Sequence, residues 1–431
     1  MSPPRDPRRR VVVIDGRRTP FCRSLTAFSE LTSYDLGRMA VSGLLHATRV
    51  DPEAVDLLVM GTVIADAATS NLGREVVLGT HLPKTCPAYT VTMACVSSLQ
   101  AFLDGARAIE SGAAEVVIAA GADTLSDAPI RYRRAVRKRL MLGQRARGPA
   151  DWLRLLRGLK LSDITPEPVA IAEFSTGEQM GENGERLAKR LGISREAQDG
   201  FAAESHRRAA EATAAGLLTD QIVPAFVAGQ KAPVTADNGV RVAEPGKLAT
   251  LRPAFDRRFG TLTAANSSYL TDGAAAVLLA SEEAAERLGL EPIARLVSSS
   301  TAGLDPLEEL LVGPAVVLPR ALAAAGLELD EVQVVELHEA FAAQVLAVLQ
   351  LLEDPDWCRD RLGRTAPVGA VDRARLNAWG GSLSVGHPFG ATGARLITTC
   401  CHRLRHEQAR HGVIAACAAG ALAIGLVLER V

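Results

Sequence analysis

A cysteine at the junction of a strand pattern and a helix pattern is the first candidate for chemistry. Cys95 follows an apolar and β-branched stretch, 88–93, and precedes apolar residues that recur at helical spacing from Val96 to Ala106. Unpaired N–H groups and the helix dipole at a helix N-terminus favour a thiolate over a thiol. Cys95 is therefore a candidate nucleophile, although a small buried residue in a tight turn fits this stretch equally well.

Two histidines and a second cysteine lie at similar junctions. His338 follows the predicted strand 333–337, His387 lies in the glycine-rich segment GGSLSVGHPFGATG, and Cys417 ends the predicted strand 412–417. Glycines allow the backbone to approach a ligand closely. Each residue taken alone also fits a structural role, because histidines and cysteines are common in cores and tight loops. Only their combination favours a reactive site.

Metal and nucleotide sites are poorly supported. The string HEAFA begins like the zinc motif HExxH, but position 342 is alanine, which excludes that site. The glycine-rich segment lacks both the Lys-Ser/Thr of a phosphate-binding loop and a GxGxxG pattern. His402 and His406 are four residues apart on a predicted helix, and we expect them on a solvent-exposed face rather than around a metal.

The composition describes a large globular α/β protein. The 431 residues suggest two or three domains, and 48% of them are hydrophobic while 4% are aromatic, which suits tightly packed sheets and helices. Lys and Arg (48) nearly balance Asp and Glu (49), so the whole chain is not a general polyanion binder. Seven cysteines without regular spacing do not form a disulfide framework, and we expect a reducing cytoplasm.

The sequence predicts no membrane span and no leader peptide. The basic start, MSPPRDPRRR, lacks the apolar core of a signal peptide and is too short and proline-rich for a transit peptide. The longest uncharged apolar run, 412–428, contains glycines at 412, 420 and 425. Two buried strands joined by a glycine turn fit this run better than a transmembrane helix.

Strands and helices are predicted to alternate along the chain. Strand patterns at 11–14, 54–64 and 115–121 are separated by helical patterns, which favours a largely parallel sheet covered by helices. The order of helix and strand after Cys95 recurs after His387. Such an internal duplication would bring the strand ends of two halves around one site.

The middle of the chain carries a strongly basic segment. Arg131–Lys160 contains eleven basic residues against one acid, which leaves 37 basic and 48 acidic residues elsewhere. Trp152, Leu155, Leu156 and Leu159 form an apolar helical stripe within it. A solvated helix packed on its own domain is one reading, and docking to a membrane surface or a partner protein is another. Nucleic acid is disfavoured because no nucleic-acid-binding motif accompanies the charge.

Five motifs together resemble the thiolase family. TMACVSS, AANSSYLTDGAAA, HEAFAAQ, GGSLSVGHPFGATGA and CAAGA occur in the family's order over essentially the whole chain. The resemblance implies duplicated α/β halves in a layered αβαβα arrangement, with an inserted, mostly helical loop domain. We expect one half at 1–125, completed by 255–290, the loop domain at 126–254 and the other half at 291–431.

The resemblance also implies roles for the candidate residues. Cys95 would be the acylated nucleophile, His387 the base that takes its proton, and Cys417 a second acid and base. His338 would hold a water or donate directly in one oxyanion hole. Backbone N–H groups of Cys95 and Ala419 would form the second hole.

Substrate contacts and one departure from the motif follow in the same way. The family's coenzyme A contacts map onto Ser268 and Met180. Coenzyme A is a substrate, and neither a metal nor a bound cofactor is implied. Ala421 replaces the glycine that usually follows CAAG, and at φ > 0 an alanine costs on the order of 1 kcal/mol and could narrow the pocket.

Within the family, the chain is most similar to long-chain 3-ketoacyl-CoA thiolases, the β subunits of fatty-acid-oxidation trifunctional complexes, because it has HEAF in place of the commoner NEAF and carries the basic insertion. This implies CoA-dependent cleavage of 3-ketoacyl-CoA to acetyl-CoA and a shortened acyl-CoA in β-oxidation. Alternatives are an acetoacetyl-CoA thiolase that condenses, or a non-catalytic lipid-CoA binding scaffold. A ketoacyl synthase would have a Cys-His-His arrangement, so the second cysteine disfavours it. A non-catalytic scaffold would lack at least one catalytic side chain, and none is missing here.

The implied partners are macromolecular as well as small. Besides 3-ketoacyl-CoA and CoA, we expect a homodimer or larger assembly and a hydratase/dehydrogenase α subunit. Arg131–Lys160 could contact a membrane peripherally, and its charge could attract the phosphates of CoA.

Overall fold

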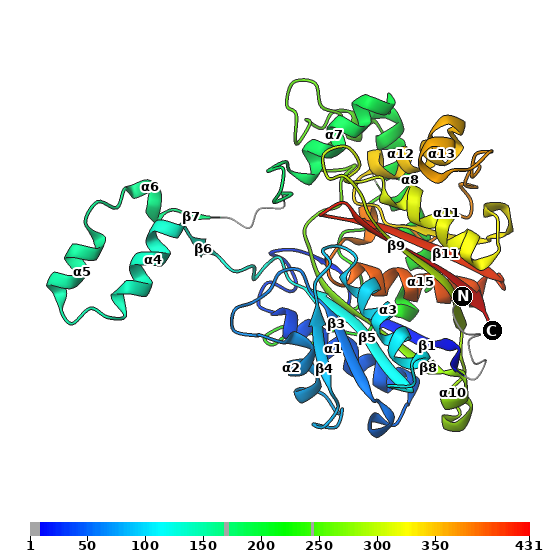
Figure 1. The fold of residues 1–431 in the computed structure, drawn as a ribbon, viewed down its shortest axis with the longest axis horizontal. Helices are drawn as coiled ribbons and strands as arrows, with labels where there is room; N and C mark the ends of the chain where they lie inside the picture. Colours follow the sequence, from blue (N-terminus) through cyan, green and yellow to red (C-terminus); the bar gives the residue numbers. More distant parts are fainter. Residues whose placement is uncertain (1–8, 168–171, 243–244) are drawn as a thin grey trace.

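The computed structural model describes residues 9–167, 172–242 and 245–431. Most of the basic N-terminal stretch lies outside these ranges. Figure 1 shows a layered body from which a small helical arm projects.

The N-terminal half is a mixed sheet with helices on both faces. Its strands run in the order β4 (Ala88–Val91), β3 (Leu57–Gly61), β5 (Val116–Asp123), β8 (Thr271–Ser281) and β1 (Val11–Arg18), and the short β2 (Cys22–Arg23) pairs with β8. Apolar residues alternate between the faces of β3, so that one face packs on α1 (Ser33–Thr48) and α2 (Leu72–Leu78) and the other on α3 (Ser97–Glu110).

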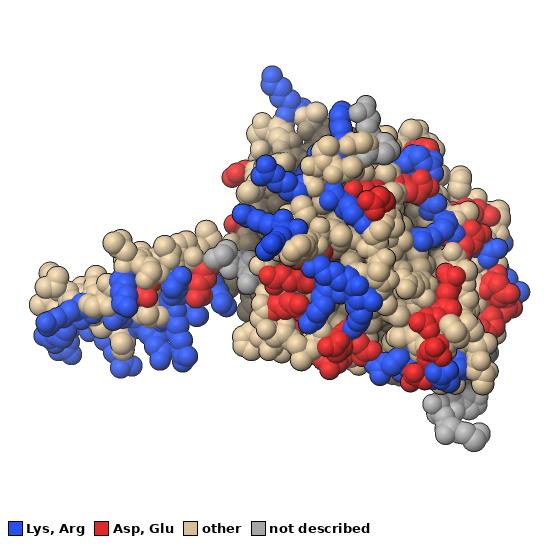
Figure 2. All heavy atoms as spheres, turned by 90° about the horizontal axis from the view of Figure 1, so that it is seen from above, with Lys and Arg blue, Asp and Glu red and all other residues tan. Residues whose placement is uncertain are grey.

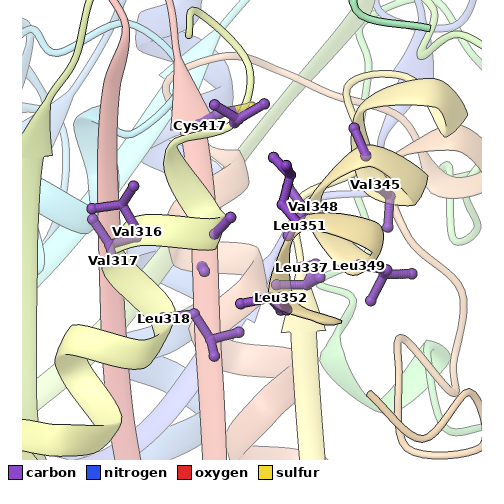
Figure 3. Close-up of a cluster of buried hydrophobic side chains, with 14 of the residues drawn as sticks. Val316, Val317, Leu318, Leu337, Val345, Val348, Leu349, Leu351, Leu352 and Cys417 are labelled. Atoms are coloured by element: carbon purple, nitrogen blue, oxygen red, sulfur yellow. The ribbon is translucent and has the colours of Figure 1, made fainter. Parts of the chain in front are cut away.

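The C-terminal half repeats this arrangement. Its strands follow the order β9 (Ala294–Gly303), β12 (Leu422–Arg430), β11 (His411–Ala418) and β10 (Val334–Leu337). One face is covered by α11 (Gly313–Ala325) and α12 (Ala342–Glu353), with α13 (Pro355–Leu362) beside α12, and the other by α15 (Thr392–His406). Figure 3 shows the outer cluster, in which side chains from α11 and α12 gather with Leu337 and Cys417.

The helices α3 and α15 form the central layer between the halves. They pack on each other and share one apolar cluster with strands of both halves. The resulting order, helices–sheet–helices–sheet–helices, is the layered arrangement that the resemblance implied. Because both sheets are covered on both faces, β5 and β8 are buried along their whole lengths.

The expectation of a largely parallel sheet is wrong. β3 is parallel to β4 and β5, and β10 is parallel to β11, but β8, β1, β9 and β12 join their neighbours antiparallel. A short pairing of β1 with β9 links the two halves into one hydrogen-bonded path. These central strands pair across large sequence separations, which a local pattern does not encode.

The apolar run 412–428 forms two buried strands, as predicted. β11 and β12 are an antiparallel hairpin whose turn contains Gly420 and Ala421. Among the residues that the structure describes, no helix is long and apolar enough to cross a membrane.

The expectation for His402 is also wrong. This side chain is 3% exposed, and its Nε2 lies 2.9 Å from Oδ1 of Asp15 on β1. Its helix, α15, lies in the central layer, so the first thirteen residues of α15 are buried on all sides. His406, one turn further along, is exposed as expected.

The basic segment forms most of the arm, defined here as residues 131–167. It comprises β6 (Arg131–Tyr132), α4 (Arg134–Gly143), α5 (Pro149–Leu156), α6 (Leu161–Ile164) and β7 (Pro166–Glu167). Its helices pack on each other rather than on the remaining inserted region, and the arm stands away from the body in Figure 1. Trp152 packs over Gly143, but Trp152 and Leu156 remain 39% and 46% exposed.

The remaining inserted helices pack on the body. α7 (Met180–Leu191) and α8 (Arg195–Ala214) contact α12, α8 also contacts the short α14 (Ser382–Val385), and α9 (Pro245–Ala249) packs on α8. The short α10 (Glu282–Leu288) follows β8 and contacts β1. The exact boundaries at 125, 254 and 290 stay predictions.

One buried carboxylate ties the two halves together. Asp123, at the end of β5, accepts hydrogen bonds from the Thr62 hydroxyl and from the backbone N–H groups of Val63 and Ile64 in its own half. It also accepts from the N–H of Gly390, in the glycine-rich loop of the other half. A Cβ on Gly390 would lie within 3.0 Å of Asp123, Thr62 and the carbonyl of Gly61, so only glycine fits there.

We expect Asp123→Asn to lower the free energy of unfolding by about 2–3 kcal/mol, because an amide nitrogen would face hydrogen-bond donors in a buried site. Urea denaturation measures the change. Asp127→Asn, which alters an exposed carboxylate four residues further along, serves as the control and should change stability by less than about 0.5 kcal/mol. Equal stability of the two variants would contradict the role given to Asp123.

Candidate active site

A cavity of about 570 Å³ gathers most of the predicted site residues. Cys95, His387, Cys417 and Ala419 all line it, and so do the tentative coenzyme A contacts Ser268 and Met180. His338 is fully buried directly behind the wall, and its ring centroid lies 4.2 Å from that of His387. Residues predicted from separate motifs in both halves therefore meet at one place.

The turn that presents Cys95 is held by a serine. Ala94 has φ +46°, a left-handed conformation that is costly for a non-glycine residue. The hydroxyl of Ser97, the first residue of α3, accepts from the N–H of Met93 and donates to the carbonyl of Ala94. The turn places Cys95 just before the helix, as predicted. The backbone N–H groups of Cys95 and Ala419 lie near its sulfur and lower the pKa of the thiol.

Burial opposes the thiolate that the helix terminus favours. Loss of water raises the pKa of the Cys95 thiol to about 12, although the two backbone N–H groups act in the opposite direction. Burial also lowers the pKa of His387 to about 3, and the charge of Arg395 adds to this shift. The resting pair is therefore a thiol and a neutral imidazole, and ionisation of Cys95 requires transfer of its proton.

The tautomer of His387 leaves a base facing the cavity. Thr392 Oγ1 lies 2.9 Å from the carbonyl oxygen of Pro388, which can only accept, and 2.6 Å from His387 Nδ1. We assign the hydroxyl proton to the carbonyl and the imidazole proton to Nδ1. Nε2 then carries the lone pair, and this atom is buried without a protein partner. The loop itself is fixed by the N–H of His387, which donates to the hydroxyl of Thr271.

His338 has the opposite tautomer. Arg395 donates to Ser382 Oγ at 2.7 Å, and Ser382 Oγ lies 3.1 Å from His338 Nδ1. Ser382 Oγ accepts from Arg395, and His338 Nδ1 is the one acceptor within reach of its proton among the described residues, so we assign the serine proton to Nδ1 and the His338 proton to Nε2. This Nε2 also lacks a protein partner. Two adjacent imidazoles thus present one acceptor and one donor.

Cys417 lies at the end of β11 as a protonated thiol. Burial raises its pKa, and the nearby Cys95 raises it further because two thiolates would repel each other. Cys417 belongs to the core cluster of the C-terminal half and also lines the cavity, together with Ala418 and Ala419. A second thiol that keeps its proton therefore lies in the same cavity as Cys95.

Ala421 has the conformation that the sequence raised as a concern. Its φ is +54°, next to Gly420 at +79°, so alanine occupies a left-handed position at a cost of about 1 kcal/mol. Its methyl group packs into the core of the C-terminal half, and the cavity wall here consists of Ala418 and Ala419. The N–H of Gly420 donates to the carboxylate of Glu173 from the inserted region.

The residues that orient the histidines escaped the motif analysis. Ser382, Thr392 and Arg395 all lie in or just after the glycine-rich segment, which is the signal that could have pointed to them. Glu339, next to His338, accepts from Asn377, Ser205 and the N–H of Leu383, and so joins the His338 strand end to the same segment. In the described part of the chain, no group of His, Cys, Asp and Glu is placed to hold a metal ion.

Comparisons with known proteins agree with this architecture. The family model described as "Thiolase, N-terminal domain" matches residues 11–283, and "Thiolase, C-terminal domain" matches 290–430. The chain is 45% identical to the mitochondrial trifunctional enzyme subunit beta of Bos taurus, over 98% of this chain and 88% of that protein. It is 44% identical to the 3-ketoacyl-CoA thiolase of Escherichia fergusonii, over 97% of both.

A solved structure extends the comparison to a ligand. The crystal structure of human mitochondrial 3-ketoacyl-CoA thiolase in complex with CoA superposes with a TM-score of 0.83, at 30% identity and over 98% of both chains. A duplicated, layered α/β fold with two cysteines and two histidines around one cavity defines an acyl-transferring enzyme. This chain belongs to the thiolase family.

We expect Ser382→Ala to release His338 from a single tautomer, because the hydroxyl that donates to Nδ1 is lost. NMR of protein labelled with ¹⁵N-histidine would show Nδ1 and Nε2 of His338 moving toward a mixture of tautomers, while His387 keeps its pattern. Ser384→Ala is the matched control, since Ser384 lies in the same loop and bonds to the carbonyl of Gly381 instead. An unchanged His338 pattern in Ser382→Ala would refute the assignment.

Proposed function

We propose that this protein is a 3-ketoacyl-CoA thiolase of fatty acid β-oxidation, which works through an acyl-Cys95 intermediate. The observation that carries the proposal is the convergence of Cys95, His387 and Cys417, from both halves, on one cavity. The names of the relatives support the same reaction. Cleavage of the Cα–Cβ bond of a 3-ketoacyl thioester requires a nucleophile, a base, an acid and two oxyanion sites.

The first half-reaction uses the neutral resting pair. The Cys95 proton passes to the free Nε2 of His387, and the sulfur attacks the keto carbon of the substrate. The Cα–Cβ bond then breaks, which leaves a thioester on Cys95 and the enolate of acetyl-CoA. The Cys417 thiol protonates the enolate carbon, and acetyl-CoA departs.

The second half-reaction returns each proton. The Cys417 thiolate takes the proton of incoming coenzyme A, whose sulfur attacks the acyl-Cys95 thioester. Cys95 leaves as a thiolate, and protonated His387 returns its proton. The raised pKa of Cys417 suits this role, because its thiolate is a strong enough base to activate another thiol.

Charge develops on a different oxygen in each half of the substrate, so two donor sites are needed. We assign one to the Nε2–H of His338, either directly or through a water. The N–H groups of Cys95 and Ala419 form the other, since both already converge on the Cys95 sulfur. Loss of one such donor typically lowers the rate by about 10²–10³-fold.

Cavity shape bears on the substrate. Ser268 and Met180 line the side that we assign to coenzyme A. Apolar side chains, among them Val63, Ile64 and Phe389, line the rest and suit an acyl chain longer than acetyl. This favours degradation of longer 3-ketoacyl-CoA over condensation to acetoacetyl-CoA.

Mass spectrometry tests the central step. After mixing with 3-ketooctanoyl-CoA in the absence of free coenzyme A, we expect a hexanoyl adduct on the peptide that contains Cys95. Cys86→Ala, which removes a buried cysteine away from the cavity, should keep the adduct, and Cys95→Ser should lose the thioester. Absence of an adduct from the wild-type protein would overturn the proposal.

The assembly is proposed on the same grounds. We place the protein in the cytoplasm, as a homodimer or larger assembly, with a hydratase/dehydrogenase α subunit as partner. The seven cysteines are unpaired, which suits a reducing compartment. A relative named as a trifunctional enzyme subunit beta supports the α-subunit partner.

The arm is the surface that we assign to a membrane or partner. Figure 2 shows basic side chains gathered along one side of it and uncharged atoms along the other. Large apolar side chains, including Met141, Leu153 and Leu161, are 65%, 78% and 87% exposed. A basic helical hairpin with exposed apolar groups suits an anionic lipid surface.

Charge reversal in the arm tests this assignment. We expect glutamate at Arg133, Arg134, Arg137 and Arg139 to abolish flotation with vesicles that contain anionic lipid, because each basic residue contributes about 1 kcal/mol near such a surface. Lysine at the same four positions keeps the charge and should keep binding. If the glutamate variant still floats and still co-purifies with the α subunit, the arm has neither role.

A further inference from the structure

A guanidinium without a hydrogen-bond partner among the described residues lines the mostly apolar cavity. Arg23 is half-buried on β2, and its Nε is buried without a hydrogen-bond partner. In the described parts of the chain, no acceptor receives a hydrogen bond from its terminal nitrogens. The guanidinium stacks on the ring of Tyr269, whose centroid lies 4.1 Å from Cζ. A half-buried cation without an anion is costly to maintain.

The charged residues around Arg23 favour the binding of an anion beside its guanidinium. Burial lowers the pKa of Arg23, and the positive charge of Arg241 lowers it further. The neighbouring Arg18, by contrast, is satisfied by a bidentate ion pair with Asp237. Arg23 is thus a charged donor group with free hydrogen-bonding capacity in a cavity that we assign to substrate.

The strand register places Arg23 on the wall that holds the catalytic base. Arg23 pairs with Thr271 across β2 and β8, and the Thr271 hydroxyl accepts from the N–H of His387. Paired residues in an antiparallel ladder project to the same face. The guanidinium therefore lies on the side of the cavity that holds His387, and we assign this side to the acyl part of the substrate. The phosphates of coenzyme A are separated from the reacting thioester by the long pantetheine arm.

We propose that Arg23 binds the terminal carboxylate of dicarboxylic 3-ketoacyl-CoA substrates, so that the enzyme cleaves chains that end in a carboxylate as well as those that end in a methyl group. This inference rests on the proposed function and names a further substrate class for the same site. Carboxylate is the anion that pairs best with a planar guanidinium, through two parallel hydrogen bonds.

Matched substrates test the proposal. The ratio of kcat/KM for 3-ketoadipyl-CoA to that for 3-ketohexanoyl-CoA, and the same ratio for the pair two carbons longer, measures recognition of the carboxylate. We expect Arg23→Leu to lower at least one ratio by about 10- to 100-fold, because a charge-assisted hydrogen bond is lost. Arg23→Lys keeps the charge and should lose less.

A second arginine provides the matched control. Arg38 also stacks on a tyrosine, Tyr34, and its Nε is also buried without a partner, but it lies on α1 outside the cavity. Arg38→Leu should leave the ratios unchanged.

Two results would overturn the proposal. Unchanged ratios in Arg23→Leu would show that the guanidinium does not meet the carboxylate. An equal loss for both substrates, with a raised KM for coenzyme A, would assign Arg23 to the phosphates instead. Failure of the wild-type protein to cleave 3-ketohexanoyl-CoA and its longer homologue would count against the proposed function itself. This outcome is distinguishable from the two results that overturn only the role of Arg23.

Discussion

The buried carboxylate of Asp123 is the contact on which the geometry of the site depends. Burial raises its pKa, while the surrounding N–H and hydroxyl donors favour the charged form. Three of these donors belong to the segment 62–64, which leads into the cavity wall, and the fourth is Gly390, three residues after His387. Asp123 thereby holds the two halves together at the loop that carries His387.

The central layer explains why the reactive groups converge. α3 and α15 pack against each other between the sheets, and each begins at a turn that carries a reactive side chain, Cys95 or His387. The strands β10 and β11 end at the same edge and add His338 and Cys417. Duplication of one strand–helix pattern thus supplies four groups from four element ends, and no long loop is needed to collect them.

The tautomers of His387 and His338 differ because their hydrogen-bonding neighbours differ. The two rings are in contact, both are buried, and burial lowers the pKa of both. A threonine that accepts from Nδ1 makes His387 a base, whereas a serine that donates to Nδ1 makes His338 a donor. In the proposed mechanism, these two hydroxyl groups would therefore decide which histidine accepts a proton and which one stabilises an oxyanion.

The sequence could predict which residues meet at the cavity because each lies in a short motif at an element end; their reactivity stays a prediction. Strand and helix periodicity located α3, β5 and the hairpin 411–430 in the same way. Pairing partners could not be read locally: β8 inserts antiparallel beside β5, and Asp15 meets His402 from 387 positions away. Hydrogen-bond direction at Ser382 and Thr392 likewise depends on third partners, and whether the arm packs on the body depends on contacts that composition does not specify.

The neutral pairing of Cys95 with His387 has a consequence for the chemistry of the resting protein. Peroxides and disulfides react with thiolates far faster than with thiols. Because burial keeps the Cys95 proton in place, the sulfur is a poor target for oxidants between turnovers. In the mechanism proposed above, the thiolate forms only when the keto carbon is close enough to react with it, so the desolvation that raises the pKa of Cys95 would also protect this thiol from irreversible oxidation.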